Sequence, residues 1–346
     1  MSLSARSLLM HDISAPSEVR WYKKVLHFKT PARTSRGALQ ERVTNILEVR
    51  NGEFHGYGEC CTMPGLLPMP TDKQMDEVCL SLQKNGFKGW NTPTPSPIRF
   101  AVECAFLSVL RGGAPRWDTP FTRSEQGLRI HHLVWMSGVD AMLQSMAIGV
   151  KKGFRCLKMK VGAFPFEQEL AMLREARSAF PHVEIRVDAN GAFAPHEALQ
   201  KLHALAEVGI SSIEQPIAVN QWEQMAELCR ISPLPIALDE ELIANCHTES
   251  ERELLLHSIK PAAVVIKPSL HGGIIAAEHW ARLAEEMNID WWVNSALESS
   301  IGLTALAEWC SFSAPQKLHG LGTGQLFADD TPAHIVLRGE NLFYIP

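Results

Sequence analysis

The chain has 346 residues, and 46% of them are hydrophobic, which is enough for one large core or two ordinary ones. Charged residues make up 21% of the chain and the net charge is -5, which argues against a nucleic-acid partner. No apolar run approaches the ~18 residues of a membrane span, and Met1–Leu9 does not resemble a signal peptide. The eight cysteines show no zinc-site spacing, so we expect a protein of the reducing cytoplasm.

The N-terminal region reads as strands and turns followed by helices. Ala38–Arg50 alternates apolar and polar residues in part, and Asn51-Gly52 marks a hairpin turn before a second strand at Phe54–Cys60. Apolar spacing then predicts helices over Thr71–Lys84 and Pro97–Arg111, with a proline-rich break between them.

From about residue 130, short apolar strands alternate with amphipathic helices. The predicted helices include Phe166–Phe180, Pro195–Val208, Glu249–Ile259 with Thr248 as a cap, and Ile274–Asn288. The predicted strands are His132–Met136, Cys156–Val161, Glu184–Val187, Ser212–Glu214, Ile236–Leu238, Ala263–Ile266, Asp290–Val293 and Leu318–Gly320. This alternation predicts an α/β fold with a parallel sheet closed into a barrel. An open doubly wound sheet would carry a glycine-rich phosphate loop after its first strand.

Acidic residues follow three successive predicted strands. Asp188, Glu214 and Asp239 are 26 and 25 residues apart, about one strand plus one helix, so they should lie at equivalent heights. Three carboxylates at one barrel end repel one another unless some are protonated or a cation binds. Oxygen ligands without His or Cys suit Mg²⁺ better than zinc. Any one of these acids alone could be a helix cap or salt-bridge partner, but three matched positions favour a metal site.

Three lysines complete the predicted site. Lys158 and Lys160 lie two residues apart on one strand, so both should point into the barrel mouth. Lys267 follows another predicted strand, four strands further around the barrel and on its far side. Mutual repulsion and burial should lower the pKa of the first two, so that one can act as a neutral base. The set suits removal of a proton next to a carboxylate, where a metal and an ammonium stabilise the charge that develops.

The ordered motifs resemble the muconate-lactonizing subgroup of the enolase superfamily. The motifs that carry the resemblance are Lys158-Met-Lys160, Asp188-Ala-Asn190, Ile213-Glu-Gln-Pro216, Leu238-Asp-Glu240, Ile266-Lys-Pro268, Gly56-Tyr-Gly-Glu-Cys60 and Phe100-Ala-Val-Glu-Cys-Ala105. Three further segments resemble the o-succinylbenzoate synthase family within that subgroup, namely Thr34-Ser-Arg-Gly37, Leu133-Val-Trp-Met136 and Ser295-Ala-Leu-Glu-Ser-Ser-Ile-Gly302.

The resemblance implies a modified (β/α)7β TIM-like barrel over residues 126–324. It also implies an N-terminal α+β capping domain, residues 1–125, completed by the C-terminal segment 325–346. The implied activity is that of a carbon–oxygen lyase of menaquinone biosynthesis. Such an enzyme dehydrates a small carboxylate, 2-succinyl-6-hydroxy-2,4-cyclohexadiene-1-carboxylate, to o-succinylbenzoate.

The resemblance also implies a role for each site residue. Lys160 is the base, Lys158 stabilises the enediolate, and Lys267 places a positive charge across the ring. Mg²⁺, with Mn²⁺ as an alternative, would be held by Asp188, Glu214 and Asp239. Residues expected to support the ligands or contact the substrate are Asn190, Glu240, Glu298, Ser299, Ser300, Gly322 and Arg36.

Other activities stay open at this point. A racemase of N-acylamino acids in the same subgroup would use Lys160 and Lys267 from opposite faces, and a muconate cycloisomerase would use the same site. Dipeptide epimerases usually carry an Asp-x-Asp pair after the last strand, where this chain has Gly320-Leu-Gly-Thr-Gly324. The carboxylate set disfavours a Schiff-base lysine enzyme, and the presence of every catalytic residue disfavours a binding module. The sequence leaves the oligomeric state open.

Overall fold

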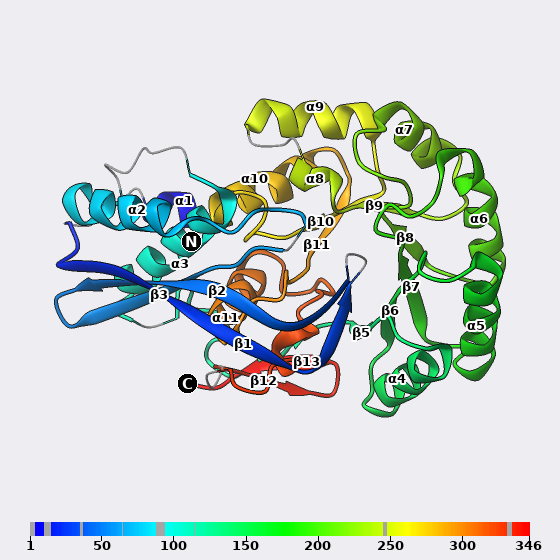
Figure 1. Ribbon diagram of the computed structural model, residues 1–346, viewed down its shortest axis with the longest axis horizontal. Coiled ribbons are helices and arrows are strands. Elements are labelled where there is room, and N and C mark those ends of the chain that lie inside the picture. Colours follow the sequence, from blue (N-terminus) through cyan, green and yellow to red (C-terminus); the bar gives the residue numbers. More distant parts are fainter. Residues whose placement is uncertain are drawn as a thin grey trace.

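A three-stranded antiparallel sheet with two helices packed on it forms the N-terminal part of the computed structural model (Figure 1). The predicted hairpin and both predicted helices are confirmed, and Thr71 caps the first helix by accepting a hydrogen bond from the Gln74 backbone at 3.2 Å. Gly58 lets the second helix approach the sheet, because an added Cβ would lie 1.8 Å from the Ala101 carbonyl oxygen. The elements are β1 (Glu18–Thr34), β2 (Gly37–Asn51), β3 (Phe54–Cys60), α2 (Asp72–Asn85) and α3 (Ser96–Leu110).

Seven parallel strands, neighbours in chain order, form the curled sheet of the second part. They are β5 (His132–Val134), β6 (Cys156–Lys160), β7 (Glu184–Asp188), β8 (Ser212–Glu214), β9 (Ile236–Leu238), β10 (Ala263–Ile266) and β11 (Asp290–Val293). Helices cover the outside of this sheet in Figure 1, namely α4 (Val139–Lys151), α5 (Phe166–Ala179), α6 (Pro195–Glu207), α7 (Trp222–Ile231), α9 (Glu249–Ile259) and α10 (Gly273–Glu286). The short helix α8 (Glu241–Ala244) follows β9, and α11 (Ser300–Ser313) packs against β3 and α3 of the N-terminal part. The predicted α/β barrel class is confirmed.

The eighth predicted strand, Leu318–Gly320, is wrong as a regular strand. The structure has two isolated parallel bridges there, from His319 to Ile130 and from Gly320 to Asn294. These bridges join the two ends of the seven-stranded sheet and so close the ring. A glycine is needed at this position, because an added Cβ on Gly320 would lie 2.0 Å from Asn294 Oδ1.

The C-terminal segment returns to both parts of the molecule. The strands β12 (Ile335–Arg338) and β13 (Asn341–Tyr344) form a small antiparallel sheet with β4 (Leu128–Arg129). Upstream of them, Phe327 bridges to Phe28 on β1, and Asp330 pairs with Lys24 at 2.8 Å. The segment therefore ties the N-terminal sheet to the barrel.

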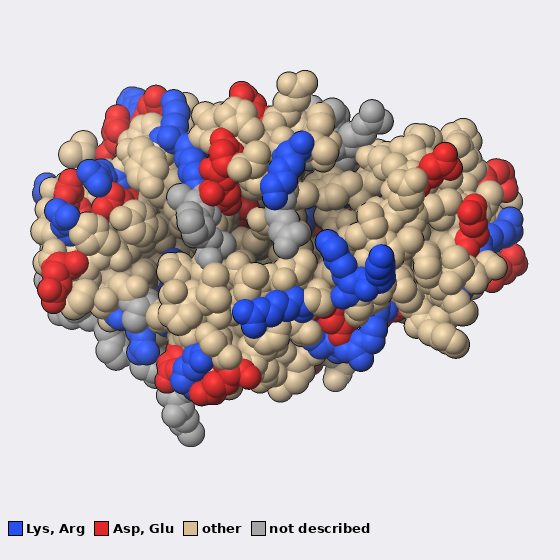
Figure 2. Space-filling view, turned by 90° about the horizontal axis from the view of Figure 1, so that it is seen from below, with Lys and Arg blue, Asp and Glu red and all other residues tan. Residues whose placement is uncertain are grey.

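The structure describes residues 4–9, 15–34, 37–63, 65–87, 94–113, 115–244, 248–330 and 334–346. At the N-terminus of this set, α1 (Ala5–Leu9) packs near α10, where the Ala5 backbone donates to Glu278 at 2.7 Å. Basic and acidic side chains lie interspersed on the face in Figure 2, as expected for a small net charge. None of the helices in the described ranges is both long and apolar enough to cross a bilayer.

Candidate active site

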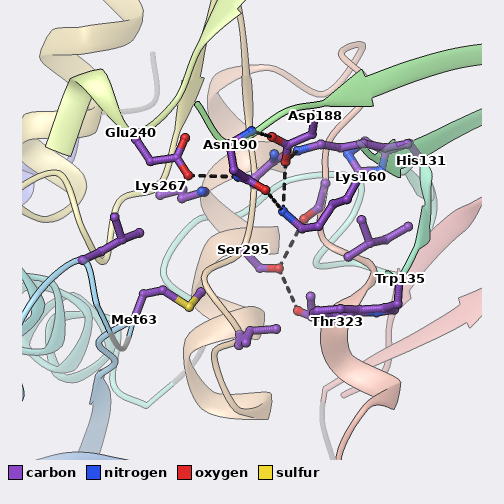
Figure 3. A pocket seen from close by; sticks show the side chains of 16 residues that line it. Met63, His131, Trp135, Lys160, Asp188, Asn190, Glu240, Lys267, Ser295 and Thr323 are labelled. Atoms are coloured by element: carbon purple, nitrogen blue, oxygen red, sulfur yellow. Dashed lines mark hydrogen bonds and ion pairs between the residues drawn. The ribbon is translucent and has the colours of Figure 1, made fainter. Parts of the chain in front are cut away.

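A cavity of about 90 Å³ opens at the C-terminal ends of the barrel strands (Figure 3). Its polar wall combines lysines, carboxylates and amides from several strands, and its apolar wall includes residues from the N-terminal part. The polar residues include Lys158, Lys160, Asp188, Asn190, Glu240 and Lys267, and the apolar ones include Met63, Leu66, Leu133, Trp135 and Leu297. Charged groups therefore meet an apolar surface that suits a carbon ring.

Lys158 and Lys160 both reach this cavity from β6, as the two-residue spacing predicts. Lys158 Nζ donates to Glu214 Oε1 at 2.6 Å and pairs with Asp188 Oδ2 at 3.0 Å. Burial alone would lower the pKa of Lys158, but the neighbouring carboxylates together raise it above its usual range. The expectation of a lowered pKa was therefore wrong for Lys158, because the sequence did not show how closely these carboxylates surround it.

Lys160 has different neighbours from Lys158. Its Nζ donates to Asn190 Oδ1 at 2.5 Å and to Asp188 Oδ2 at 3.2 Å. Asn190 in turn donates from Nδ2 to Glu240 Oε1 at 2.9 Å. The Lys160 side chain is 15% exposed, compared with 7% for Lys158 and 11% for Lys267. Lys160 thus has the most exposed side chain of the three lysines.

The first two predicted metal ligands lie side by side. Lys160 on β6 is the register partner of Asp188 on β7, and Asp188 is the register partner of Glu214 on β8. The strands β6, β7 and β8 therefore end at one level. Burial would raise the pKa of Asp188, but Lys158, Lys160 and Lys267 together hold it well below its usual range. Burial and the neighbouring Asp188 raise the pKa of Glu214 well above its usual range. This crowding of like charges is the situation that a bound cation relieves.

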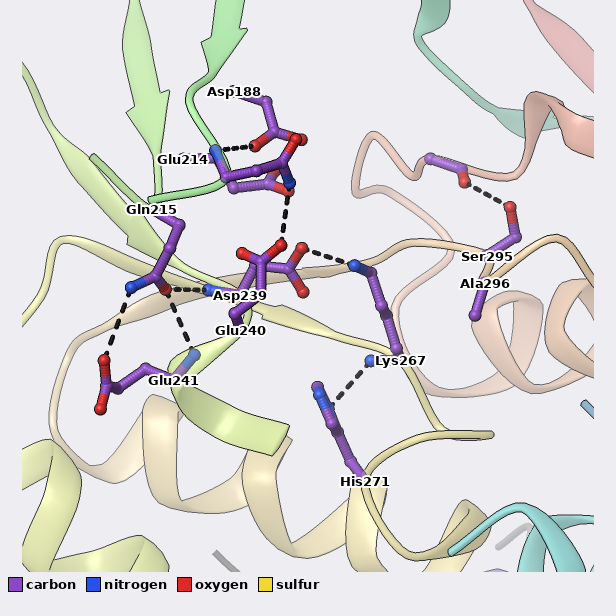
Figure 4. Close-up of polar contacts among 12 residues, drawn as sticks. Asp188, Glu214, Gln215, Asp239, Glu240, Glu241, Lys267, His271, Ser295 and Ala296 are labelled. Atoms are coloured by element: carbon purple, nitrogen blue, oxygen red, sulfur yellow. Dashed lines mark hydrogen bonds and ion pairs between the residues drawn. The ribbon is translucent and has the colours of Figure 1, made fainter. Parts of the chain in front are cut away.

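Three consecutive acidic residues follow β9, and each has different partners (Figure 4). Lys267 Nζ donates to Asp239 Oδ2 at 2.5 Å, from the opposite side of the site to Lys160. Glu240 accepts from Asn190, and Glu241 accepts from the Trp222 indole at 2.7 Å. Asp239 therefore pairs directly with a lysine at the site.

The donor set fits Mg²⁺ in identity and burial, but the expected equal heights hold only for Asp188 and Glu214, because the register partner of Glu214 on β9 is Ala237, two residues before Asp239. Asp188, Glu214 and Asp239 are 2%, 3% and 0% exposed, and Asp239 Oδ1 is buried with no hydrogen-bond partner among the described residues. Within those residues, no three acid, imidazole or thiol groups surround one point closely enough to enclose a cation. Lys158 Nζ contacts one oxygen of each of two carboxylates, Asp188 Oδ2 and Glu214 Oε1.

The remaining predicted residues lie around the cavity rather than on its surface, apart from Asn190 and Glu240. Glu298 accepts from Ser269 Oγ at 2.5 Å, Ser299 donates to Glu59 on β3 at 2.6 Å, and the Ser300 backbone donates to Asp330 at 2.6 Å. These three residues, together with Gly322, are not among the described lining residues. Arg36 lies outside the described residues.

Sequence reasoning missed three polar residues of the cavity wall, His131, Asn294 and Ser295. Burial and the nearby Lys158 hold the pKa of His131 well below its usual range, so the imidazole is neutral. The signal available was position, because His131 directly precedes a predicted strand and Asn294 directly follows one. Both positions belong to the bridged segments that close the ring.

Comparisons with known proteins agree on the fold. A family model described as enolase C-terminal domain-like matches residues 141–334. An o-succinylbenzoate synthase from Desulfotalea psychrophila is 36% identical over 93% of this chain and 97% of the relative. The solved structure of MenC from that organism has a TM-score of 0.81 at 32% identity, covering 95% of this chain and 99% of that chain.

A more distant solved structure carries both a metal and a dipeptide. It is a dipeptide epimerase from Enterococcus faecalis complexed with Mg and L-Leu-L-Tyr, with a TM-score of 0.82 at 20% identity. The alignment covers 96% of this chain and 98% of that chain, and at this identity it shows the shared fold alone.

Proposed function

Because this chain belongs to the enolase superfamily, we propose that it is an o-succinylbenzoate synthase. The reaction removes one water molecule from 2-succinyl-6-hydroxy-2,4-cyclohexadiene-1-carboxylate and leaves an aromatic ring. The observation that supports this most directly is Lys160 Nζ, held by Asn190 and Asp188 at the polar end of a cavity with an apolar wall.

The proposed first step is proton transfer to Lys160. In its neutral form, Lys160 Nζ takes the proton from the ring carbon next to the carboxylate, and that electron pair moves toward the carboxylate oxygens. Lys158 and Lys267 then provide positive charge on either side of the site, where negative charge develops. When bound by Asp188, Glu214 and Asp239, Mg²⁺ supplies further positive charge beside the same carboxylate.

The second step is loss of hydroxide. The carbon–oxygen bond breaks as the ring becomes aromatic, and Lys160 returns its proton to the leaving hydroxide, which gives water. Proton removal and return by one lysine require both groups on the same face of the ring, so the elimination is syn. Trp135, Leu133 and Leu297 offer the apolar surface against which the ring can lie.

Several finer features of the enzyme belong to the same proposal. Mn²⁺ is expected to substitute for Mg²⁺, because both prefer oxygen ligands. We also propose capping residues 1–125 and 325–346 around a barrel of residues 126–324, with Asn190 and Glu240 supporting the base. The tie between Phe327 and Phe28 supports this division. A cytoplasmic location stays a prediction of the sequence, and the oligomeric state stays open.

The test is purified protein with Mg²⁺, offered the cyclohexadiene substrate beside a panel of N-acylamino acids and dipeptides. We expect turnover of the cyclohexadiene substrate to exceed that of every other substrate. Faster racemisation of an N-acylamino acid would instead make the protein an N-acylamino acid racemase. Faster epimerisation of a dipeptide would make it a dipeptide epimerase.

A further inference from the structure

Gln215 is fully buried, and the proposed reaction gives it no part. It directly follows Glu214, within the motif Ile213-Glu-Gln-Pro216. Its backbone has a φ of 39°, in the left-handed region that residues other than glycine seldom adopt. Such a conformation persists only where the surrounding structure fixes it, and it is common at functional sites.

The Gln215 side chain joins the end of β8 to the end of β9 (Figure 4). Its Oε1 accepts from the Asp239 backbone at 3.1 Å and from the Glu241 backbone at 3.3 Å. Its Nε2 donates to the Ile217 carbonyl at 3.0 Å and to Glu241 Oε2 at 3.5 Å. The amide thereby uses both acceptor sites and both donors.

The Gln215 backbone adds a second contact with β9 and a first contact with the segment after β7. Its N–H donates to the Ala237 carbonyl at 2.8 Å, on β9, and its carbonyl accepts from the Gly191 backbone at 2.7 Å. Gly191 lies three residues after Asp188, at the end of β7. This one residue is therefore bonded next to all three carboxylates of the proposed metal site.

Glu241 holds the far side of the amide in place. It is 1% exposed, and its Oε1 accepts from the Trp222 indole at 2.7 Å and from the Asn220 backbone at 2.9 Å. A carboxylate fixed by one donor from the loop before α7 and one from the first residue of α7 leaves the Gln215 amide little freedom to rotate.

We infer that Gln215 is a positioning residue that sets the separation of Glu214 and Asp239, and with it the affinity of the site for Mg²⁺. This rests on the proposed function, in which those two carboxylates hold the ion. Removal of a group that hydrogen-bonds to the metal-binding residues and orients them typically weakens metal affinity by about 10- to 100-fold.

Two substitutions test the inference, with Mg²⁺ affinity measured by isothermal titration calorimetry on the full chain. Gln215→Met keeps the length of the side chain but removes all four side-chain bonds, and we expect a Kd about 10- to 100-fold weaker. Gln215→Asn keeps an amide that tolerates positive φ, but it is one methylene too short to reach both backbone N–H groups. We expect this milder variant to fold and to bind Mg²⁺ about 10-fold more weakly.

The matched controls are Gln221→Met and Gln221→Asn, because the Gln221 amide donates to Ala218 at 3.3 Å, outside this network. We expect both to keep the wild-type Kd. The thermal midpoint of each metal-free variant separates stability from positioning. Folded Gln215 variants with a wild-type Kd would overturn the inference, even with a lowered midpoint.

The two proposals fail in different ways. Wild-type protein that binds no Mg²⁺ would overturn the metal site, and the inference with it. Wild-type protein that binds Mg²⁺ but leaves the cyclohexadiene substrate unchanged would overturn the proposed activity. The inference would then stand or fall on the Gln215 affinities alone.

Discussion

Lys160→Ala is the sharpest test of the proposed chemistry. The substitution removes the most exposed of the three lysine side chains and leaves Lys158 and Lys267 with their own carboxylate partners. It takes one donor each from Asn190 Oδ1 and Asp188 Oδ2, but Asn190 still donates from Nδ2 to Glu240, and Asp188 Oδ2 still pairs with Lys158. The structural change should therefore stay local.

The expected effects on rate and on stability differ in size. A positioned acid–base group typically contributes about 10²- to 10⁴-fold to a rate. That factor corresponds to about 2.7–5.5 kcal/mol of activation free energy. The two lost hydrogen bonds face a cavity that water can enter, so we expect the free energy of unfolding to fall by only about 1 kcal/mol. A large loss of kcat with nearly unchanged stability is the expected result.

The assay follows formation of the aromatic product by absorbance, beside urea unfolding of the same preparations. Lys201→Ala is the matched control, because Lys201 has a side chain 18% exposed and pairs with Glu197 at 2.5 Å, away from the site. We expect the control to keep wild-type turnover. A folded Lys160→Ala enzyme within tenfold of the wild-type kcat would show that Lys160 is not the base.

Three further predictions concern the metal, a loop and a histidine. EDTA should abolish turnover and added Mg²⁺ should restore it, whereas full activity in EDTA would contradict the metal site. Glu169→Ala should lower the free energy of unfolding by about 3 kcal/mol in urea titrations, because Glu169 accepts backbone hydrogen bonds from Gly162 to Phe164 just after Lys160. Burial lowers the pKa of His319 to about 4, so the folded state binds fewer protons than the unfolded chain. The contribution of neutral His319 to the free energy of unfolding, about 3 kcal/mol, should be fully present above pH ~6.5 and should be lost as the pH falls toward 4. His319→Asn should flatten that dependence, and an unchanged slope would contradict the assignment.

Local sequence patterns predicted most of the elements that build the barrel. Predicted helices such as Glu249–Ile259 match the structure because their apolar spacing and caps are local signals. The long strand β1 was not predicted as an element. Its exposed positions carry residues such as Arg20 and Lys23, so it lacks a continuous apolar pattern.

Placement within the site followed two different rules. The heights of Lys160, Asp188 and Glu214 were predictable, because parallel strands of similar length end at one level. The hydrogen-bond partners of Glu298 and Ser299 were not predictable. Glu298 accepts from Ser269 in a loop, and Ser299 donates to Glu59 on β3, both distant in the chain.

The sequence by itself therefore determined the identity and order of the reactive groups, since strand periodicity and strand-plus-helix spacing are encoded locally. Only the tertiary structure decided the charge state of Lys158, which depends on Asp188 and Glu214 arriving within 3.0 Å of its ammonium. The same is true of Gln215, whose bonds join three strand ends. Electrostatic and hydrogen-bond energies depend on distances between residues far apart in the chain, and those distances exist only after the barrel has closed.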